Sequence, residues 1–119
     1  MQNTNYIYGG NQQFADSIIH YYKDNKDVTF DTNDKELLKF IGGLKTEEAK
    51  KELVSKDIAT INDHTVTAEI KKEAHNRVIQ FLLDHKSDIS AWAGSITKAT
   101  IVAILAKYGL SLMDVGLTG

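Results

Sequence analysis

The stretch "ISAWAGSITKATIVAILAKY", residues 89–108, is apolar along most of its length and decides how the rest of the chain packs. Before Lys98 it has the pattern of an ordinary amphipathic helix. After Lys98 the apolar side chains leave no polar face, because they point in different directions around a helix: Ile101, Val102, Ile104 and Leu105. A helix that is apolar all round is surrounded by protein or by lipid. We therefore expect water to be excluded from residues 99–106.

Three environments fit this stretch. It is a central helix wrapped by shorter ones, a surface for self-association or for a protein partner, or a membrane-inserting segment. A membrane span needs about 20 mostly apolar residues. The two lysines leave uncharged runs of only nine residues (89–97) and eight residues (99–106). The pattern favours the core over the partner surface, and both over the membrane.

The pattern of apolar residues in the remaining chain is typical of helices, and the absence of proline agrees with this. Apolar spacing of three and four residues predicts helices at 12–22, 31–43, 46–56, 67–86 and 87–109. Thr32, Asn33 or Asp34 is expected to cap the second of these helices. Residues 57–66 lack this spacing and are expected to connect two helices, and residues 110–115 to form a last turn. The sequence predicts a mainly α fold, a compact bundle of about five helices.

Two short segments suggest a minor β element. Tyr6, Ile7 and Tyr8 have the side chains of a strand, and so does "VTF" at 28–30. Gly9 and Gly10 would end the first segment in a turn, with Asn11 capping the helix that follows. The predicted organisation is a polar N-terminal arm over residues 1–12 and a single helical domain over residues 13–119.

Composition excludes several classes of function. No cysteine is present, which removes disulfides, thiolate metal sites and thiol nucleophiles. The net charge of -2 offers no basic excess for nucleic acid. The N-terminus does not resemble a secretory signal, so we expect a cytoplasmic protein.

No constellation of side chains predicts catalysis, a metal or another cofactor. The four histidines, His20, His64, His75 and His85, never fall at the three- or four-residue spacing of helical metal ligands. Asp84 and His85 are neighbours in a helix and point about 100° apart, so they cannot form a base with its orienting group. We expect a protein that is not an enzyme.

The glycine pair raises one further alternative. Free amides after Gly9 and Gly10 could bind an anion if a helix began there. The flanking residues match neither GxGxxG nor the lysine-containing phosphate loop. The turn interpretation is favoured, and a small-ligand sensor stays open as an alternative.

The segment "NYIYGGNQQFAD", residues 5–16, resembles the leader of small helical effector-associated or adaptor modules in prokaryotic anti-phage conflict systems. This resemblance implies an adaptor role in bacterial or phage antiviral defence and carries over no catalytic residue. We predict a non-enzymatic interaction module that binds a protein partner or itself, with a membrane-active effector as an alternative. The predicted contact residues are Tyr6, Tyr8, Trp92, Ile101, Ile104, Leu105 and Tyr108.

Overall fold

Helices form almost all of the regular structure. The computed structural model describes residues 3–117, with side chains described from Gln12 onward. This part of the chain contains six α-helices, one 3₁₀ helix and no strand. The elements are α1 (Asn3–Tyr21), α2 (Thr32–Gly42), α3 (Glu48–Ile61), α4 (Ala68–Asp84), α5 (Lys86–Ala93), α6 (Lys98–Lys107) and the 3₁₀ helix η1 (Met113–Val115). The predicted mainly α class is confirmed.

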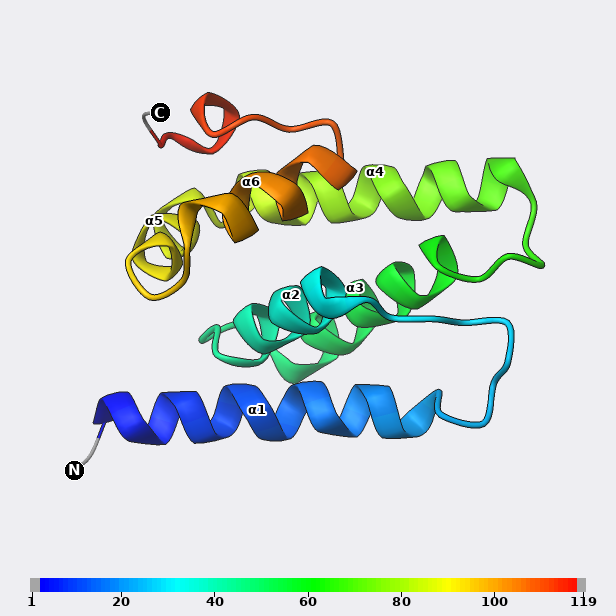
Figure 1. Ribbon diagram of the computed structural model, residues 1–119, viewed down its shortest axis with the longest axis horizontal. Helices are drawn as coiled ribbons and strands as arrows, with labels where there is room; N and C mark the ends of the chain where they lie inside the picture. The colour runs from blue at the N-terminus through cyan, green and yellow to red at the C-terminus, as the bar shows by residue number, and fades with distance from the viewer. Residues whose placement is uncertain (1–2, 118–119) are drawn as a thin grey trace.

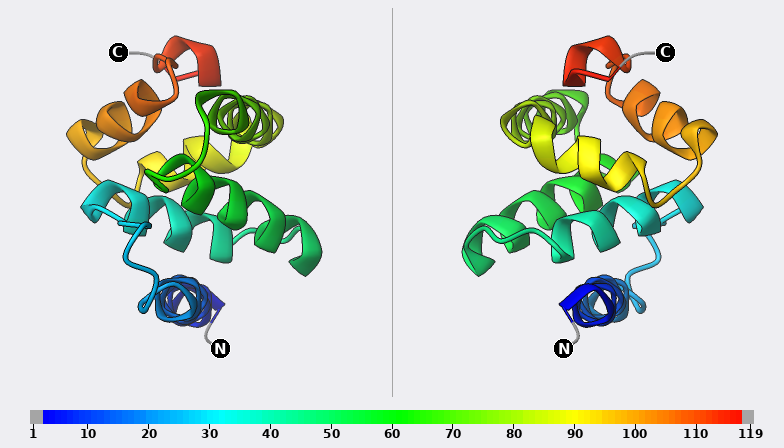
Figure 2. Two further views of the ribbon diagram at one scale, coloured as in Figure 1. Left: turned by 90° about the vertical axis from the view of Figure 1, so that its right-hand side faces the viewer. Right: turned by 90° about the vertical axis from the view of Figure 1, so that its left-hand side faces the viewer.

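The helices stack in layers (Figure 1). Helix α1 lies along one side, α2 and α3 form the middle, and α4, α5 and α6 lie on the other side with η1 outermost. Both views in Figure 2 show α1 end-on beneath the α2–α3 layer. Helix α1 packs mainly on α2, whereas α2 contacts both α3 and α6. The middle layer therefore separates α1 from the C-terminal helices.

Capping residues fix where the best-predicted helices begin. The Asp31 carboxylate caps α2 by accepting a hydrogen bond from the backbone N–H of Asp34, and the Asp34 carboxylate accepts one from the backbone N–H of Asp31. This reciprocal arrangement satisfies two amides that the first helical turn leaves free. Thr67 caps α4 through the N–H of Ile70. These two helices begin and end within about two residues of their predicted bounds.

The prediction of a single helix at 87–109 is wrong, because residues 94–97 are not helical and separate α5 from α6. Helix α5 ends at Gly94, and the Thr97 side chain accepts a hydrogen bond from the N–H of Thr100 to start α6. After the break, α6 packs against α2. Serine, threonine and glycine at such positions favour helix ends over helix interiors.

Helix α6 buries one face and exposes the other. Its buried side chains follow a spacing of three and four residues and are Ile101, Ile104 and Leu105. The exposed side chains of this stretch are apolar as well and are Ala99, Val102, Ala103 and Ala106, with Val102 43% exposed. The expectation that water is excluded from all of residues 99–106 is therefore wrong, and only the buried face of α6 belongs to the core. Of the three environments expected for this stretch, the core is the one in which the structure places it.

Two further expectations fail. Residues 3–11 belong to helix α1, so the predicted strand at Tyr6–Tyr8 and the turn at Gly9–Gly10 are not formed. Glycine costs a helix about 1 kcal/mol in propensity but does not forbid it. The predicted connector at 57–66 is helical as far as Ile61, where Ile58 and Ala59 are buried against neighbouring helices.

The predicted β element reduces to one contact between loops. Val28 forms an isolated antiparallel bridge with Asp63, and the N–H of His64 donates to the carbonyl of Asp27 at 3.1 Å. The partner of the 28–30 segment is thus the loop before α4, and not the N-terminal segment. This contact ties the connection between α1 and α2 to the body.

Candidate functional site

The predicted contact residues lie mostly inside the fold. Ile101, Ile104, Leu105 and Tyr108 are each at most 2% exposed. Trp92 is 9% exposed and stacks on Phe40, with 4.3 Å between ring centroids. Tyr6 and Tyr8 lie in α1, but their side chains are outside the described part. A partner that contacted the five buried side chains, those of Trp92, Ile101, Ile104, Leu105 and Tyr108, would have to displace α5 or α6.

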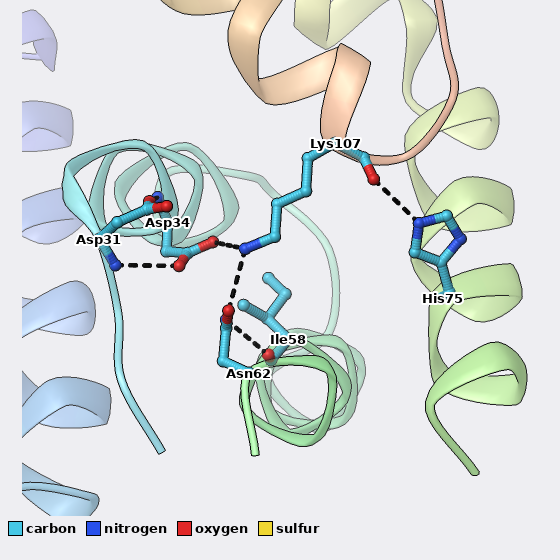
Figure 3. A network of polar contacts seen from close by, with 6 residues as sticks. All are labelled: Asp31, Asp34, Ile58, Asn62, His75 and Lys107. Carbon is cyan, nitrogen blue, oxygen red and sulfur yellow. Dashed lines mark hydrogen bonds and ion pairs between the residues drawn. The ribbon is translucent and has the colours of Figure 1, made fainter. Parts of the chain in front are cut away.

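Instead, the C-terminal end of α6 is fixed by a group of polar side chains, which we call the polar junction: Asp31, Asp34, Asn62 and Lys107 (Figure 3). The Lys107 ammonium donates to Asp34 Oδ1 at 2.6 Å and to Asn62 Oδ1 at 3.0 Å. The Asn62 amide donates in turn to the carbonyl of Ile58 at 2.9 Å. Lys107 therefore connects α6 to the start of α2 and the end of α3.

Burial makes this ion pair asymmetric. The Asp34 side chain is 2% exposed, whereas that of Lys107 is 27% exposed. Asp34 Oδ2 also accepts from the N–H of Asp31 at 3.0 Å, so both of its carboxylate oxygens are bonded. A buried carboxylate needs such partners, because removing a charge from water is costly. The junction thus stabilises the meeting point of three helices.

Two aromatic groups complete the surroundings of Lys107. His75 Nε2 lies 3.0 Å from the Lys107 carbonyl and must carry a proton there, because a carbonyl oxygen only accepts. The His75 ring also lies against the Tyr108 ring, with 5.1 Å between centroids. The Tyr108 hydroxyl is buried and has no hydrogen-bond partner within residues 3–117. Burial raises the pKa of Tyr108 well above its usual value, and the nearby Asp34 and Asp31 carboxylates raise it further.

The bonds of the polar junction join helices, since Lys107 bonds to both Asp34 and Asn62. The raised pKa of Tyr108 makes its phenol a weaker acid than usual. Local spacing places Asp34 at the start of a helix, as a candidate cap, but it indicates no partner for its side chain. The contact of Asp34 with Lys107 joins positions 73 residues apart and could not be predicted from local spacing.

An open groove lies between α1 and α3, with the end of α2 at its base. We call this the α1–α3 groove; its volume is about 420 Å³ and its lining residues are Gln13, Phe14, Ser17, Ile18, Gly42, Glu48, Lys51 and Glu52. Phe14 and Ile18 are half-buried, so part of each apolar side chain faces the groove. The sequence does not predict this groove, because its two walls come from separate helices.

The α1 wall depends on a close approach at Gly42. A Cβ atom at Gly42 would lie 2.5 Å from the Cβ of Phe14, which is far inside normal contact distance. Lys51 closes the base by donating to the Gly42 carbonyl at 3.0 Å. That carbonyl lies at the C-terminal end of α2, where a positive charge is stabilised by the helix dipole.

A second, smaller cavity of about 190 Å³ lies between α5, α6 and the segment around η1. Its lining is mainly apolar and consists of Ala93, Lys98, Ile101, Leu112 and Leu117. It presents few polar atoms that could orient a ligand, and specific ligand sites usually combine apolar walls with a few such groups.

Residues 3–117 contain neither a metal-binding cluster nor a helix that could span a membrane. No three histidine, aspartate or glutamate side chains in this range are grouped so that they could hold a metal ion. No helix in the same range is both long enough and apolar enough to cross a bilayer. The histidines instead serve local contacts, as when His85 Nδ1 bonds the Phe81 carbonyl at 2.8 Å.

The glycine pair that suggested an anion site lies inside α1. Its amides are therefore in the interior of a helix, where N–H groups bond to carbonyls of the preceding turn. Comparison with known proteins adds no relative: no family model, no curated protein and no solved structure matches the chain.

Proposed function

We propose that this protein is a non-enzymatic protein-interaction module, an adaptor that holds a segment of another protein in the α1–α3 groove. The observation that carries this proposal is the groove itself, which is open to solvent and partly apolar. Docking a partner helix or strand into such a groove is a common mode of peptide recognition.

The way α1 is attached supports this role. Helix α1 packs mainly on α2, so one flank of α1 faces α3 across the groove without closing on it. Part of each apolar side chain of Phe14 and Ile18 stays open to this groove. Exposed apolar surface in a groove is typical of contact surfaces.

The polar groups in the interior support a structural and not a chemical role. Lys107, Asp34 and Asn62 bond to one another, and His75 bonds to the backbone of α6. The resemblance of residues 5–16 to conflict-system adaptors agrees with a binding function. In this protein those residues belong to helix α1 and not to an arm. We therefore propose antiviral defence only as the biological context of the protein.

Site-specific photocrosslinking tests the proposal. A benzophenone side chain replaces Ser17, which lines the groove, or Asn76, an exposed residue of α4, in cells that express the protein. We expect discrete adducts from position 17 that excess unlabelled protein competes away, and not from position 76. An adduct of twice the chain mass would identify the partner as a second copy. Identical adduct patterns from both positions, or none from position 17, would overturn the proposal.

A further inference from the structure

The charges around the α1–α3 groove are unevenly placed. Helix α1 contributes only uncharged side chains to the lining, whereas α3 contributes Glu48, Lys51 and Glu52. The two glutamates are one helical turn apart and both are exposed, and the Glu48 side chain is 66% exposed. The rim of the groove on the α3 side is therefore a pair of carboxylates.

Lys51 does not cancel this charge at the rim. Its side chain is only 10% exposed and points to the base, where the ammonium donates to the Gly42 carbonyl at 3.0 Å. The distance from the Lys51 ammonium to Glu48 Oε1 is 3.9 Å, close to the limit of an ion pair. The structure gives Glu52 no ion pair within the described range of the chain. Both carboxylates can thus accept an incoming cation.

The opposite wall is suited to apolar anchors. Phe14 and Ile18 are four residues apart on α1 and so lie on one face of that helix. A partner helix presents apolar side chains at the same spacing, and its flanking polar positions then face the α3 rim. Lysine or arginine at those positions would meet Glu48 and Glu52, whereas acidic residues would be repelled.

We infer that the occupant of the α1–α3 groove is a basic amphipathic segment of a partner protein, with apolar residues on Phe14 and Ile18 and cationic residues on Glu48 and Glu52. This inference rests on the proposed function and names the chemistry of its partner. Charge complementarity at the α3 rim carries it, since the α1 wall alone would accept any apolar stripe.

Two synthetic peptides of equal length provide the test. Both carry the same leucine stripe at helical spacing, and their other positions are lysine in one and glutamate in the other. Binding of each labelled peptide to the full chain is measured by fluorescence anisotropy at low and at high salt. We expect the lysine peptide to bind at least tenfold more tightly, and added salt to weaken it.

A matched pair of variants locates the effect. Glu48→Gln with Glu52→Gln removes two charges from the rim, and Glu69→Gln with Glu73→Gln removes two from the exposed start of α4 at the same spacing. Both variants change the net charge by the same amount. We expect the rim variant to bind the lysine peptide roughly tenfold more weakly, because two exposed ion pairs are lost. The α4 variant should bind within about twofold of the parent protein.

Each contrary result is distinct. Equal weakening by both variants would show attraction by the whole protein's charge and overturn the inference, and so would equal binding of the two peptides. If neither peptide binds while position 17 still yields specific adducts, the interaction module stands and the basic partner is wrong. If the adducts are also absent, the proposed function fails as well.

Discussion

Helix α6 and helix α1 are both outer elements of the fold, yet they are held in different ways. The Lys107 ammonium at the end of α6 bonds to Asp34 of α2 and to Asn62, the residue after α3. His75 of α4 bonds to the Lys107 carbonyl. Helix α1 packs mainly on α2, through apolar side chains and the close approach of Phe14 to Gly42.

The difference separates a fixed end of the molecule from an adjustable one. Polar contacts to three other elements have strict distance and angle requirements, so α6 has one position. An apolar contact with one helix lacks such directional requirements and tolerates small shifts. The α1–α3 groove lies at the less constrained boundary, where a partner could be admitted without breaking a buried hydrogen bond.

The largest effect in this comparison is expected from Lys107→Met. The substitution leaves the Asp34 carboxylate, 2% exposed, without its cation and should lower the free energy of unfolding by about 3 kcal/mol. Asp34→Asn should cost less, because the Lys107 side chain is 27% exposed and can turn its charge to water. Urea denaturation followed by circular dichroism measures both.

Lys39→Met is the matched control for Lys107. Its ammonium pairs with Glu36 one helical turn away at 3.2 Å, and the two side chains are 34% and 28% exposed, so neither charge is fully buried. Pairs that stay in contact with water contribute at most about 1 kcal/mol. An equal loss of stability in the Lys39 and Lys107 variants would show that the polar junction does not hold α6 more firmly than a surface pair would.

An intermediate effect is expected from Gly42→Ala. The new Cβ would lie 2.5 Å from the Cβ of Phe14, so α1 must move. Overpacking of this kind costs about 1–3 kcal/mol, partly offset by the better helix propensity of alanine. Hydrogen exchange should accelerate in residues 12–21 of α1 and stay unchanged in α6.

Gly94→Ala is the control for the glycine substitution. A Cβ there would meet only the Ala91 carbonyl oxygen at 3.4 Å, and the residue has ordinary right-handed helical angles. The free energy of unfolding of the Gly94→Ala variant should stay within about 0.5 kcal/mol of the parent value. Exchange that accelerates equally in α1 and α6 of the Gly42 variant would show that the two boundaries respond as one unit.

The sequence predicted well those features that depend on nearby residues. The bounds of α2 and α4 followed from apolar spacing, which acts within one or two turns. The cap expected for α2 was Thr32, Asn33 or Asp34, whereas the structure shows that Asp31 is the cap. The same local signals were present at residues 94–97, where glycine, serine and threonine mark the break before α6. They were outweighed by the apolar spacing on either side, so one long helix was expected.

Features that depend on distant residues were not predictable in the same way. Asp34 and Lys107 each look like ordinary residues of a helix terminus, and only the fold brings them to 2.6 Å. The α1–α3 groove likewise needs two helices whose relative position no spacing reveals. Ile58 and Ala59 stay helical because neighbouring helices bury them, and tertiary contacts of this kind override weak local patterns.

The smallest effect is expected from Tyr108→Phe, which changes the buried residue that follows Lys107 in the chain. At neutral pH the change removes a buried hydroxyl that has no partner within the described residues, so stability should stay the same or rise by up to about 1 kcal/mol. The pKa of Tyr108 is raised in the folded state above its usual value of 10.0. Above that pH the unfolded chain releases the phenolic proton while the folded protein retains it.

Folded Tyr108 therefore binds more protons than unfolded Tyr108 in alkaline solution, and its contribution to stability falls as pH rises above about 10. The Phe variant lacks this loss, so its advantage over the parent protein should grow with pH in urea titrations between about pH 9 and pH 11. Tyr21→Phe is the control, because that ring is 79% exposed. A constant difference between the Tyr108 variant and the parent across this range would mean that the phenol reaches water, and that the junction is as adjustable as the α1 boundary.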